Sequence, residues 1–347
     1  MMPARGYAAI TSRSPLEPFA FERRDVGAHD VLIDIAACGV CHSDIHQAES
    51  DWGPDIFPMV PGHEVVGTVS EVGNDVTRFA VGDRVGIGCY VNSCGECEMC
   101  GAGDENHCPD WSTTYNGYER DGVTPTYGGY SDRIVVDEKY VLRIPEGPDT
   151  FEVAPLLCAG ITVYPPLKEY AGPGREVAIV GLGGLGHVAV RIAKAMGSRV
   201  TVISHSPGKE ADAKRLGADA FVATSDPGAL KPLRTSFDMV LSTVSSGIDL
   251  DAYLRTLKTR GTFVIVGLPV EEMSFNAGTL VEEARAIVGA KLAGIEMTQE
   301  MLDFCAAHGI VADVEVIDFA DINAAWERVK ATDVRYRFVI DIAGTLA

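Results

Sequence analysis

The sequence predicts an α/β protein of two domains, one mainly β and the other built on a doubly wound parallel sheet. The chain has 347 residues, and single domains commonly have roughly 100–200. Up to about residue 150, short β-type segments are separated by glycine and proline, whereas from residue 175 strand-length and helix-length segments alternate. A composition of 46% hydrophobic and 22% charged residues is globular, which excludes a mostly disordered or fibrous chain.

The first region is predicted to form a barrel or a sandwich. Four segments have the composition of strands, at residues 31–40, 63–73, 83–91 and 130–145. Many short strands joined by frequent turns are typical of such β domains.

The second region has the pattern of a parallel sheet covered by helices on both faces. It begins with a strand at 177–180 and a helix from about Leu185, and further strands and helices follow up to residue 293. Beyond it we expect a helix at 298–309 and a mixture of strand and amphipathic helix at 314–342.

The charge of the chain excludes two classes of partner. It carries 29 Lys and Arg against 49 Asp and Glu, a formal charge of −20, which repels nucleic-acid phosphates and anionic membrane surfaces. There is no apolar run of signal-peptide length near the start and no run of about 18 apolar residues elsewhere. We therefore expect a cytoplasmic protein whose nine cysteines form no disulfide framework, and the clustering of four of them indicates metal binding.

A glycine-rich loop follows the first strand of the second region. Its residues fit the pattern G-x-G-x-x-G and include Gly181, Gly183, Gly184, Leu185 and Gly186. Between a strand and a helix, such glycines permit a tight turn and let backbone amides approach a pyrophosphate, whose charge the helix N-terminus favours. The loop therefore predicts a dinucleotide cofactor.

The end of the next strand indicates which dinucleotide is bound. A carboxylate there would bind the adenosine ribose 2′-OH of NAD, whereas the 2′-phosphate of NADP needs a cation and no carboxylate. This chain has Ser204, His205, Ser206 and Lys209 there, and no acid before Glu210. NADP(H) is therefore the predicted cofactor.

Four cysteines form a closed metal-binding pattern. Cys94, Cys97, Cys100 and Cys108 are spaced C-x2-C-x2-C-x7-C, and four thiolates satisfy a tetrahedral zinc ion completely, as a structural site requires. An iron–sulfur cluster is the alternative, but ferredoxin motifs place the fourth cysteine three residues after the third.

A second group of metal-ligand residues is dispersed along the chain. Cys41 and His63 offer a thiolate and an imidazole, both suited to zinc, and a catalytic zinc needs a third protein ligand and an open position. Cys158 is the candidate, although on spacing alone a cysteine in an apolar stretch is more often an inert core residue.

These motifs resemble those of the zinc-dependent medium-chain alcohol dehydrogenases, and most closely their cinnamyl-alcohol-dehydrogenase-like branch of NADPH aldehyde reductases. The resemblance extends over essentially the whole chain. Besides the four-cysteine segment and the glycine loop, it includes residues 38–46 (CGVCHSDIH), 61–67 (PGHEVVG), 154–164 (APLLCAGITVY), 298–305 (TQEMLDFC) and 333–340 (DVRYRFVI).

The resemblance implies a domain organisation and a set of metal ligands. Residues 1–152 and 292–347 would form a GroES-like catalytic domain, and residues 153–291 a Rossmann cofactor domain. Two zinc ions per chain are implied, a structural one in the four-cysteine segment and a catalytic one. The implied catalytic ligands are Cys41, His63 and Cys158, with Glu64 as an alternate ligand.

The resemblance also implies roles for residues around the catalytic zinc. Asp44 would orient His63, since a metal-bound imidazole usually donates its other N–H to an acceptor. His42 would lie near the cofactor pyrophosphate, which Arg337 would help to hold. Ser43 and His46 match a proton relay that runs from the alkoxide through a hydroxyl, the nicotinamide ribose and an imidazole to solvent.

The implied reaction is hydride transfer between NADP(H) and aromatic or medium-length aldehydes or primary alcohols. A homodimer is implied through the sheet edge near residues 262–269.

Residues 289–295 (GAKLAGI) depart from the branch, which commonly has a serine followed by Ile-Gly-Gly. Trp52 matches an aromatic of the branch, and Cys38, Cys89 and Cys305 are expected to be core thiols. Two alternatives stay open, an NAD-dependent polyol dehydrogenase and a non-catalytic zinc- and nucleotide-binding sensor with a broken ligand set.

Overall fold

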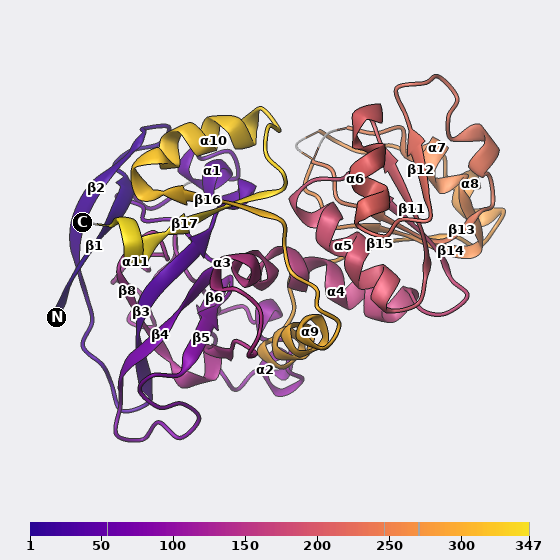
Figure 1. Cartoon of the computed structure of the whole chain (residues 1–347). Coiled ribbons are helices and arrows are strands. Elements are labelled where there is room, and N and C mark those ends of the chain that lie inside the picture. The colour runs from indigo at the N-terminus through magenta and orange to yellow at the C-terminus, as the bar shows by residue number, and fades with distance from the viewer. Residues whose placement is uncertain (54, 246, 270, 347) are drawn as a thin grey trace. The chain divides into compact units, whose positions relative to one another are not determined.

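The chain forms two compact units. A computed structural model describes residues 1–53, 55–245, 247–269 and 271–346. One unit comprises Met1–Cys158 with Ala293–Ala347, and the other Ala159–Leu292 (Figure 1). The predicted fold class is confirmed, because the first unit is mainly β and the second carries an all-parallel sheet.

The second unit is a doubly wound sheet with the strand order β12-β11-β10-β13-β14-β15. Its strands are β10 (Glu176–Val180), β11 (Arg199–Ser204), β12 (Ala220–Ala223), β13 (Phe237–Ser242), β14 (Leu257–Ile265) and β15 (Ala286–Gly289). The order reverses between β10 and β13, and open sheets of this type bind ligands beyond the carboxyl ends of the strands at such a point. The glycine loop begins directly after β10.

Helices cover both faces of this sheet. Figure 1 shows α5 and α6 on one face and α7 on the other. The helices are α4 (Ala159–Tyr170), α5 (Gly184–Ala195), η4 (Pro207–Lys209), α6 (Glu210–Arg215), η5 (Lys231–Leu233), α7 (Leu250–Leu254) and α8 (Ala277–Val281). Apolar side chains from the strands and from α7 form a core between them, including Val240, Leu254 and Phe263, which are fully buried.

One prediction about this sheet is wrong. The segment near residues 262–269 was expected to lie at the edge through which a dimer forms. Its strand, β14, instead lies between β13 and β15, and β15 is outermost among the described strands. The sequence predicted a strand there, but strand order follows from crossover connections that hydrophobicity does not encode.

The first unit is organised around the long strand β3 (Asp30–Gly39). The main sheet has the order β16-β17-β3-β4-β5-β9, with β8 also paired to β3, and two small hairpin sheets join β1 to β2 and β6 to β7. The other strands are β1 (Met2–Ala9), β2 (Leu16–Arg23), β4 (Val65–Val72), β5 (Arg84–Ile87), β6 (Tyr90–Asn92), β7 (Ser112–Thr113), β8 (Arg133–Asp137), β9 (Leu142–Arg143), β16 (Val314–Asp318) and β17 (Arg337–Asp341).

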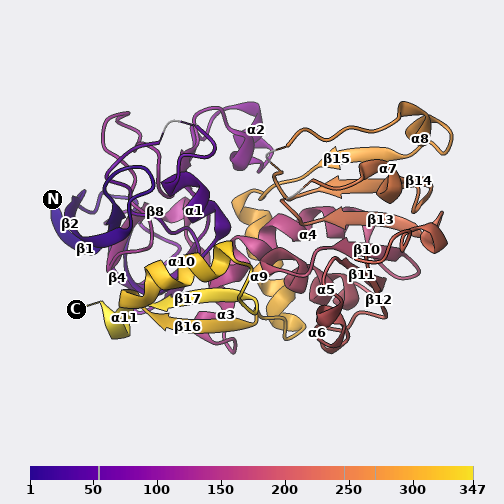
Figure 2. The same cartoon turned by 90° about the horizontal axis from the view of Figure 1, so that it is seen from above.

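Helices lie between these strands along the chain, and one of them, α10 (Ile322–Lys330), runs alongside β17 in Figure 2. They are α1 (His42–Ala48), α2 (Glu98–Gly101), η1 (Glu105–His107), η2 (Glu138–Tyr140), α3 (Thr150–Val153), η3 (Ala154–Leu157), α9 (Ile295–Ala307), η6 (Phe319–Asp321), α10 (Ile322–Lys330) and α11 (Ile342–Thr345). Within the described residues, no single helix is long and apolar enough to cross a membrane, although one bent pair of helices meets the length and composition criteria together.

Candidate active site

The pairing of two strands brings Cys41 beside His63 and Glu64. Strands β3 and β4 run antiparallel with Cys38 opposite Val65, so the end of β3 lies beside the start of β4. Cys41 follows β3 as the N-cap of α1, whereas His63 and Glu64 precede β4.

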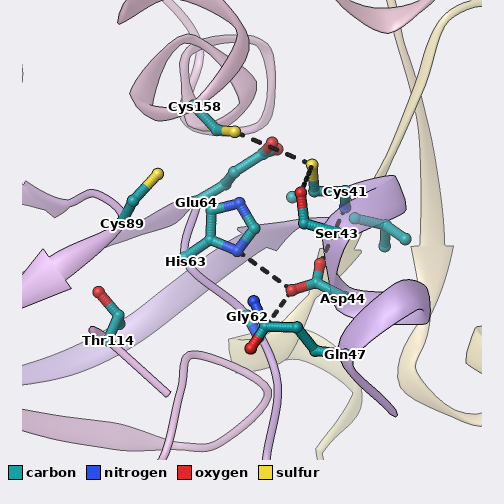
Figure 3. A network of polar contacts seen from close by, with 12 residues as sticks. Cys41, Ser43, Asp44, Gln47, Gly62, His63, Glu64, Cys89, Thr114 and Cys158 are labelled. Atoms are coloured by element: carbon teal, nitrogen blue, oxygen red, sulfur yellow. Dashed lines mark hydrogen bonds and ion pairs between the residues drawn. The ribbon is translucent and has the colours of Figure 1, made fainter. Parts of the chain in front are cut away.

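The four side chains form one buried cluster. One ligand atom from each of Cys41, His63, Glu64 and Cys158 lies within 4.8 Å of every other. Cys158 directly follows η3, and its Sγ is 3.8 Å from Cys41 Sγ (Figure 3). Each residue is at most 8% exposed, and the hydrogen bond with Cys158 lowers the pKa of the Cys41 thiol well below its usual range. The cluster contains the four residues that the resemblance implies.

Asp44 supports this cluster from inside α1. Its Oδ1 is 3.1 Å from His63 Nδ1, which is the contact the resemblance implies. Its Oδ2 accepts a 2.9 Å hydrogen bond from the backbone N–H of Cys41, so one carboxylate holds two candidate ligands. The sequence analysis missed this second contact, although an acid three residues after an N-cap is a recognisable signal of a capping box.

Glu64 lies fully buried opposite a cation. Arg337 at the start of β17 places Nη1 3.4 Å from Glu64 Oε1 and donates to the carbonyl of Val40. Burial raises the pKa of Glu64 to about 8, although Arg337 opposes this. A Cβ at Gly39 would lie 1.9 Å from Glu64 Oε2, so the glycine makes room for the carboxylate. Sequence reasoning missed this requirement, because it depends on strand pairing.

The expected relay residues lie on α1. Ser43 Oγ is 3.3 Å from Cys41 Sγ, so the hydroxyl contacts the cluster and does not cap the helix, whose N-cap is Cys41. His46 is 21% exposed, and its Nδ1 is 2.9 Å from Asp51 Oδ2. Asp51 was not predicted, and the sequence carries no signal for it beyond nearness.

An aromatic stack holds the ring of His46. His42 lies on one side with ring centroids 4.9 Å apart, and Trp52 lies 4.8 Å away. His42 is thus in the first unit, where its burial lowers its pKa. Trp52 is 44% exposed, and its contact with the His46 ring was not predicted from the sequence.

The other expected core thiols differ among themselves. Cys38 and Cys305 are buried, as predicted. Cys89 is only partly buried and lies near the cluster (Figure 3). The pKa of the Cys158 thiol is raised well above its usual value, mainly by its hydrogen bond with Cys41 and next by its hydrogen bond with Cys89. All nine cysteines are free thiols.

The four-cysteine lobe, residues 94–108, forms the other candidate metal site. The sulfur atoms of Cys94, Cys97, Cys100 and Cys108 lie within 4.8 Å of one another. Backbone N–H groups donate to three of them, at 3.3 Å to Cys94, 3.5 Å to Cys97, and 3.3 and 3.4 Å to Cys108. Amides from Glu96 and Cys97 lower the pKa of Cys94 to about 7, which favours the thiolate.

Both groups fit the metal that the resemblance implies. The lobe offers four sulfurs, as a closed tetrahedral zinc site requires, and backbone amides donate to three of them. In the buried cluster the donors are two sulfurs, one imidazole and a carboxylate. Glu64 Oε1 is ion-paired with Arg337, but neither oxygen of Glu64 accepts a hydrogen bond from the described residues. Buried polar atoms that lack hydrogen bonds cost free energy, which a bound cation would offset.

Most of the predicted cofactor residues lie together in the second unit, whereas His42 and Arg337 belong to the first unit. Gly183 is the N-cap of α5 and faces open space, whereas a Cβ at Gly186 would lie 2.1 Å from the Gly181 carbonyl oxygen. Lys209 Nζ donates to the carbonyl of Leu182 at 2.9 Å, so the cation lies against the glycine loop. The remaining predicted residues are Gly184 and Leu185 at the start of α5, Ser204 at the end of β11, and the exposed His205 and Ser206.

Two family models and several known proteins match this chain. The family described as alcohol dehydrogenase GroES-like domain matches residues 27–146, and the family of zinc-binding dehydrogenases matches residues 184–307. NADP-dependent alcohol dehydrogenase C 1 of Mycolicibacterium smegmatis is 54% identical over 346 residues, which cover 99% of both chains.

Two solved structures are similar over nearly the whole chain. A cinnamyl alcohol dehydrogenase of Sorghum bicolor has a TM-score of 0.96 at 45% identity, covering 99% of this chain and 98% of that one. The cinnamyl alcohol dehydrogenase of Helicobacter pylori, in complex with NADP(H), has a TM-score of 0.92 at 38% identity and covers 99% of both chains.

Proposed function

The chain belongs to the zinc-binding medium-chain alcohol dehydrogenases, in the branch of the NADP-dependent and cinnamyl alcohol dehydrogenases, and we propose that it interconverts aromatic or medium-chain aldehydes and primary alcohols with NADP(H). The observation that carries this proposal is the buried cluster of Cys41, His63, Glu64 and Cys158, supported by Asp44. A sensor that had lost turnover would be expected to lack part of this set.

Cys41, His63 and Cys158 would hold the catalytic zinc, with Glu64 as an alternate donor. Zinc bound there supplies a Lewis acid that polarises the substrate oxygen, and the nicotinamide supplies or accepts the hydride. The chain's own contribution is to hold the donors. Asp44 accepts hydrogen bonds from the Cys41 amide and the His63 ring. Because Asp44 is fully buried, water does not compete for these bonds.

Ser43 and His46 are assigned to proton transfer. The Ser43 hydroxyl lies beside the Cys41 sulfur, where it can donate a proton to a nascent alkoxide. His46 is partly exposed and hydrogen-bonded to Asp51, so its ring can exchange a proton with water while the carboxylate fixes its orientation. His42 and Arg337 are assigned to the cofactor pyrophosphate, as the resemblance implies.

In the second unit, the glycine loop and Lys209 are assigned to NADP(H). Amides of Gly183, Gly184, Leu185 and Gly186 at the α5 N-terminus would bind the pyrophosphate. Ser204, His205, Ser206 and Lys209 would surround the 2′-phosphate, since the segment has a cation and no carboxylate before Glu210.

Three finer points belong to the same proposal. The four-cysteine lobe would hold a second, structural zinc, which makes two per chain. The enzyme would act as a homodimer, with β15 as the sheet edge available for pairing. It would work in the cytoplasm.

The proposal is tested by following the absorbance of NADPH with a panel of aldehydes and polyols, and repeating the assay with NADH. We expect oxidation of NADPH by aromatic or medium-chain aldehydes, and a Lys209→Ala variant whose KM for NADPH rises about tenfold, the value of one charge-assisted hydrogen bond, with KM for NADH unchanged. Preference for NAD and vicinal diols would favour the polyol dehydrogenase. No turnover with any substrate would favour the sensor.

A further inference from the structure

Asp44 has more hydrogen-bond partners than the orientation of His63 requires. Each carboxylate oxygen accepts two bonds, and each pair joins one candidate ligand to one other residue. Oδ1 lies 3.1 Å from His63 Nδ1 and 3.2 Å from the Gly62 N–H. Oδ2 accepts from the Cys41 N–H at 2.9 Å and from the Tyr130 hydroxyl at 3.2 Å. Tyr130 is the only one of these partners that reaches Asp44 through a side-chain hydroxyl.

The surroundings of Tyr130 fix the direction of that hydroxyl. The side chain is fully buried, and its ring packs edge-on against Phe319 with centroids 6.2 Å apart. On another side the ring meets Gly62, where a Cβ would lie 2.6 Å from Cδ1. Burial raises the pKa of the Tyr130 phenol well above its usual value, so the hydroxyl keeps its proton and acts as a donor.

We infer that Tyr130 is a positioning residue for the catalytic metal, because its hydroxyl fixes the Asp44 carboxylate that in turn holds Cys41 and His63. The inference rests on the proposed function. Without the hydroxyl, Oδ2 would keep only the Cys41 amide as a donor, and a buried carboxylate that loses a donor must rotate or draw closer to those that remain. Either change moves two ligands together, since both are bonded to the same carboxylate.

The Tyr130→Phe variant removes the hydroxyl and keeps the ring that fills the core. Tyr253→Phe is the matched control, because Tyr253 is a buried tyrosine of the second unit whose ring packs edge-on against Phe263. Both variants and the wild type are prepared as full chains with cobalt in the catalytic cluster. The visible absorption of the cobalt and its rate of loss to a chelator are then measured.

We expect Tyr130→Phe to shift the cobalt absorption and to lose the metal about 3- to 10-fold faster, less than the roughly 10- to 100-fold of groups that contact metal ligands directly, because Tyr130 acts through Asp44. Tyr253→Phe should match the wild type in both measurements. The effect should vanish when Tyr130→Phe is introduced into an Asp44→Ala background, because the hydroxyl acts through the Asp44 side chain and alanine leaves it no acceptor there.

Two results overturn the inference alone: an unshifted spectrum with the wild-type rate of metal loss, or an effect of the same size in the Asp44→Ala background, which would assign Tyr130 a packing role. A wild-type chain that binds no cobalt at Cys41, His63 and Cys158 overturns the proposed function as well. The two failures are therefore distinguishable.

Discussion

The two candidate metal sites lie in the same unit but are built in different ways. The catalytic cluster takes its donors from three separated segments, mixes sulfur, nitrogen and oxygen, and is buried. The lobe takes four sulfurs from residues 94–108 alone, and three of its cysteines are only partly buried. A side-chain carboxylate, Asp44, supports the first, whereas backbone amides support the second.

This difference separates a site made by the tertiary structure from one made by a loop. The cluster exists only once β3 pairs with β4, because that register sets Cys41 beside His63. The lobe needs only its own segment: three of the amides that donate to a sulfur lie two or three residues from it, and the Cys94 amide reaches Cys108 at the other end of the same segment. We therefore expect loss of the cluster's metal to affect chemistry, and loss of the lobe's metal to affect stability.

The largest effect is expected for Cys158→Ala, which removes one ligand of the cluster. Turnover should fall on the order of 10³-fold, because polarisation of the substrate oxygen by the metal lowers the activation barrier by several kcal/mol. The midpoint of thermal unfolding should stay near that of the wild type, since Cys158 lies at the end of η3 and not within a strand. Activity assays and calorimetry on the same preparation check both. If Cys158→Ala also lowered the thermal midpoint by about as much as a substitution in the lobe, the two sites would not differ in the way proposed.

The converse result is expected for Cys97→Ser in the lobe. The thermal midpoint should fall by about 10 °C, because a structural metal contributes folding free energy and each kcal/mol shifts the midpoint by about 2–4 °C in a chain of this class. Turnover at low temperature should stay within about twofold of the wild type. Metal analysis should find the catalytic ion retained. A variant that unfolds no earlier but loses turnover would contradict the assignment of the lobe to stability.

The same difference explains what the sequence could and could not predict. The lobe was identified from spacing alone, because its geometry is local. For the cluster, spacing indicated Cys41 and His63 but left Cys158 undecided, and the family resemblance was needed to include it. The parallel sheet and the glycine loop followed from alternating segments and the turn after β10.

Contacts between distant strands were beyond sequence reasoning. The carboxylate of Glu64 rests against the backbone of Gly39, a constraint that no local pattern reveals. Asp51 lies five residues after His46 and accepts a hydrogen bond from its ring, but many acidic residues lie near histidines in sequence without contacting them. The position of β14 inside the sheet is likewise a matter of topology, which is why the predicted edge was wrong.

Gly39→Ala sharpens the comparison at a smaller scale. A Cβ at Gly39 would collide with Glu64 Oε2, so we expect a loss of about 1–3 kcal/mol in unfolding free energy, as for overpacked cores. Gly101→Ala in the lobe is the control, because a Cβ there would meet no atom within 4 Å. Denaturant unfolding measures both. Equal effects of the two substitutions would mean that the cluster is no more tightly packed than the lobe.

The smallest effect is expected at the rim of the cluster, for Asp51→Asn. The asparagine keeps an oxygen near His46 Nδ1 but removes the charge that stabilises a protonated ring, so proton exchange through His46 should slow. We expect kcat to fall about fivefold, less than the 10²-fold or more of a direct acid–base group, with KM for the aldehyde little changed. Arg13→Gln is the matched control, because Arg13 pairs with the other carboxylate oxygen of Asp51 at 2.7 Å and is mostly exposed. If both variants slow turnover equally, the ion pair between Arg13 and Asp51 sets the rate, and not the contact between Asp51 and His46. Asp51 would then have no part in the proton relay.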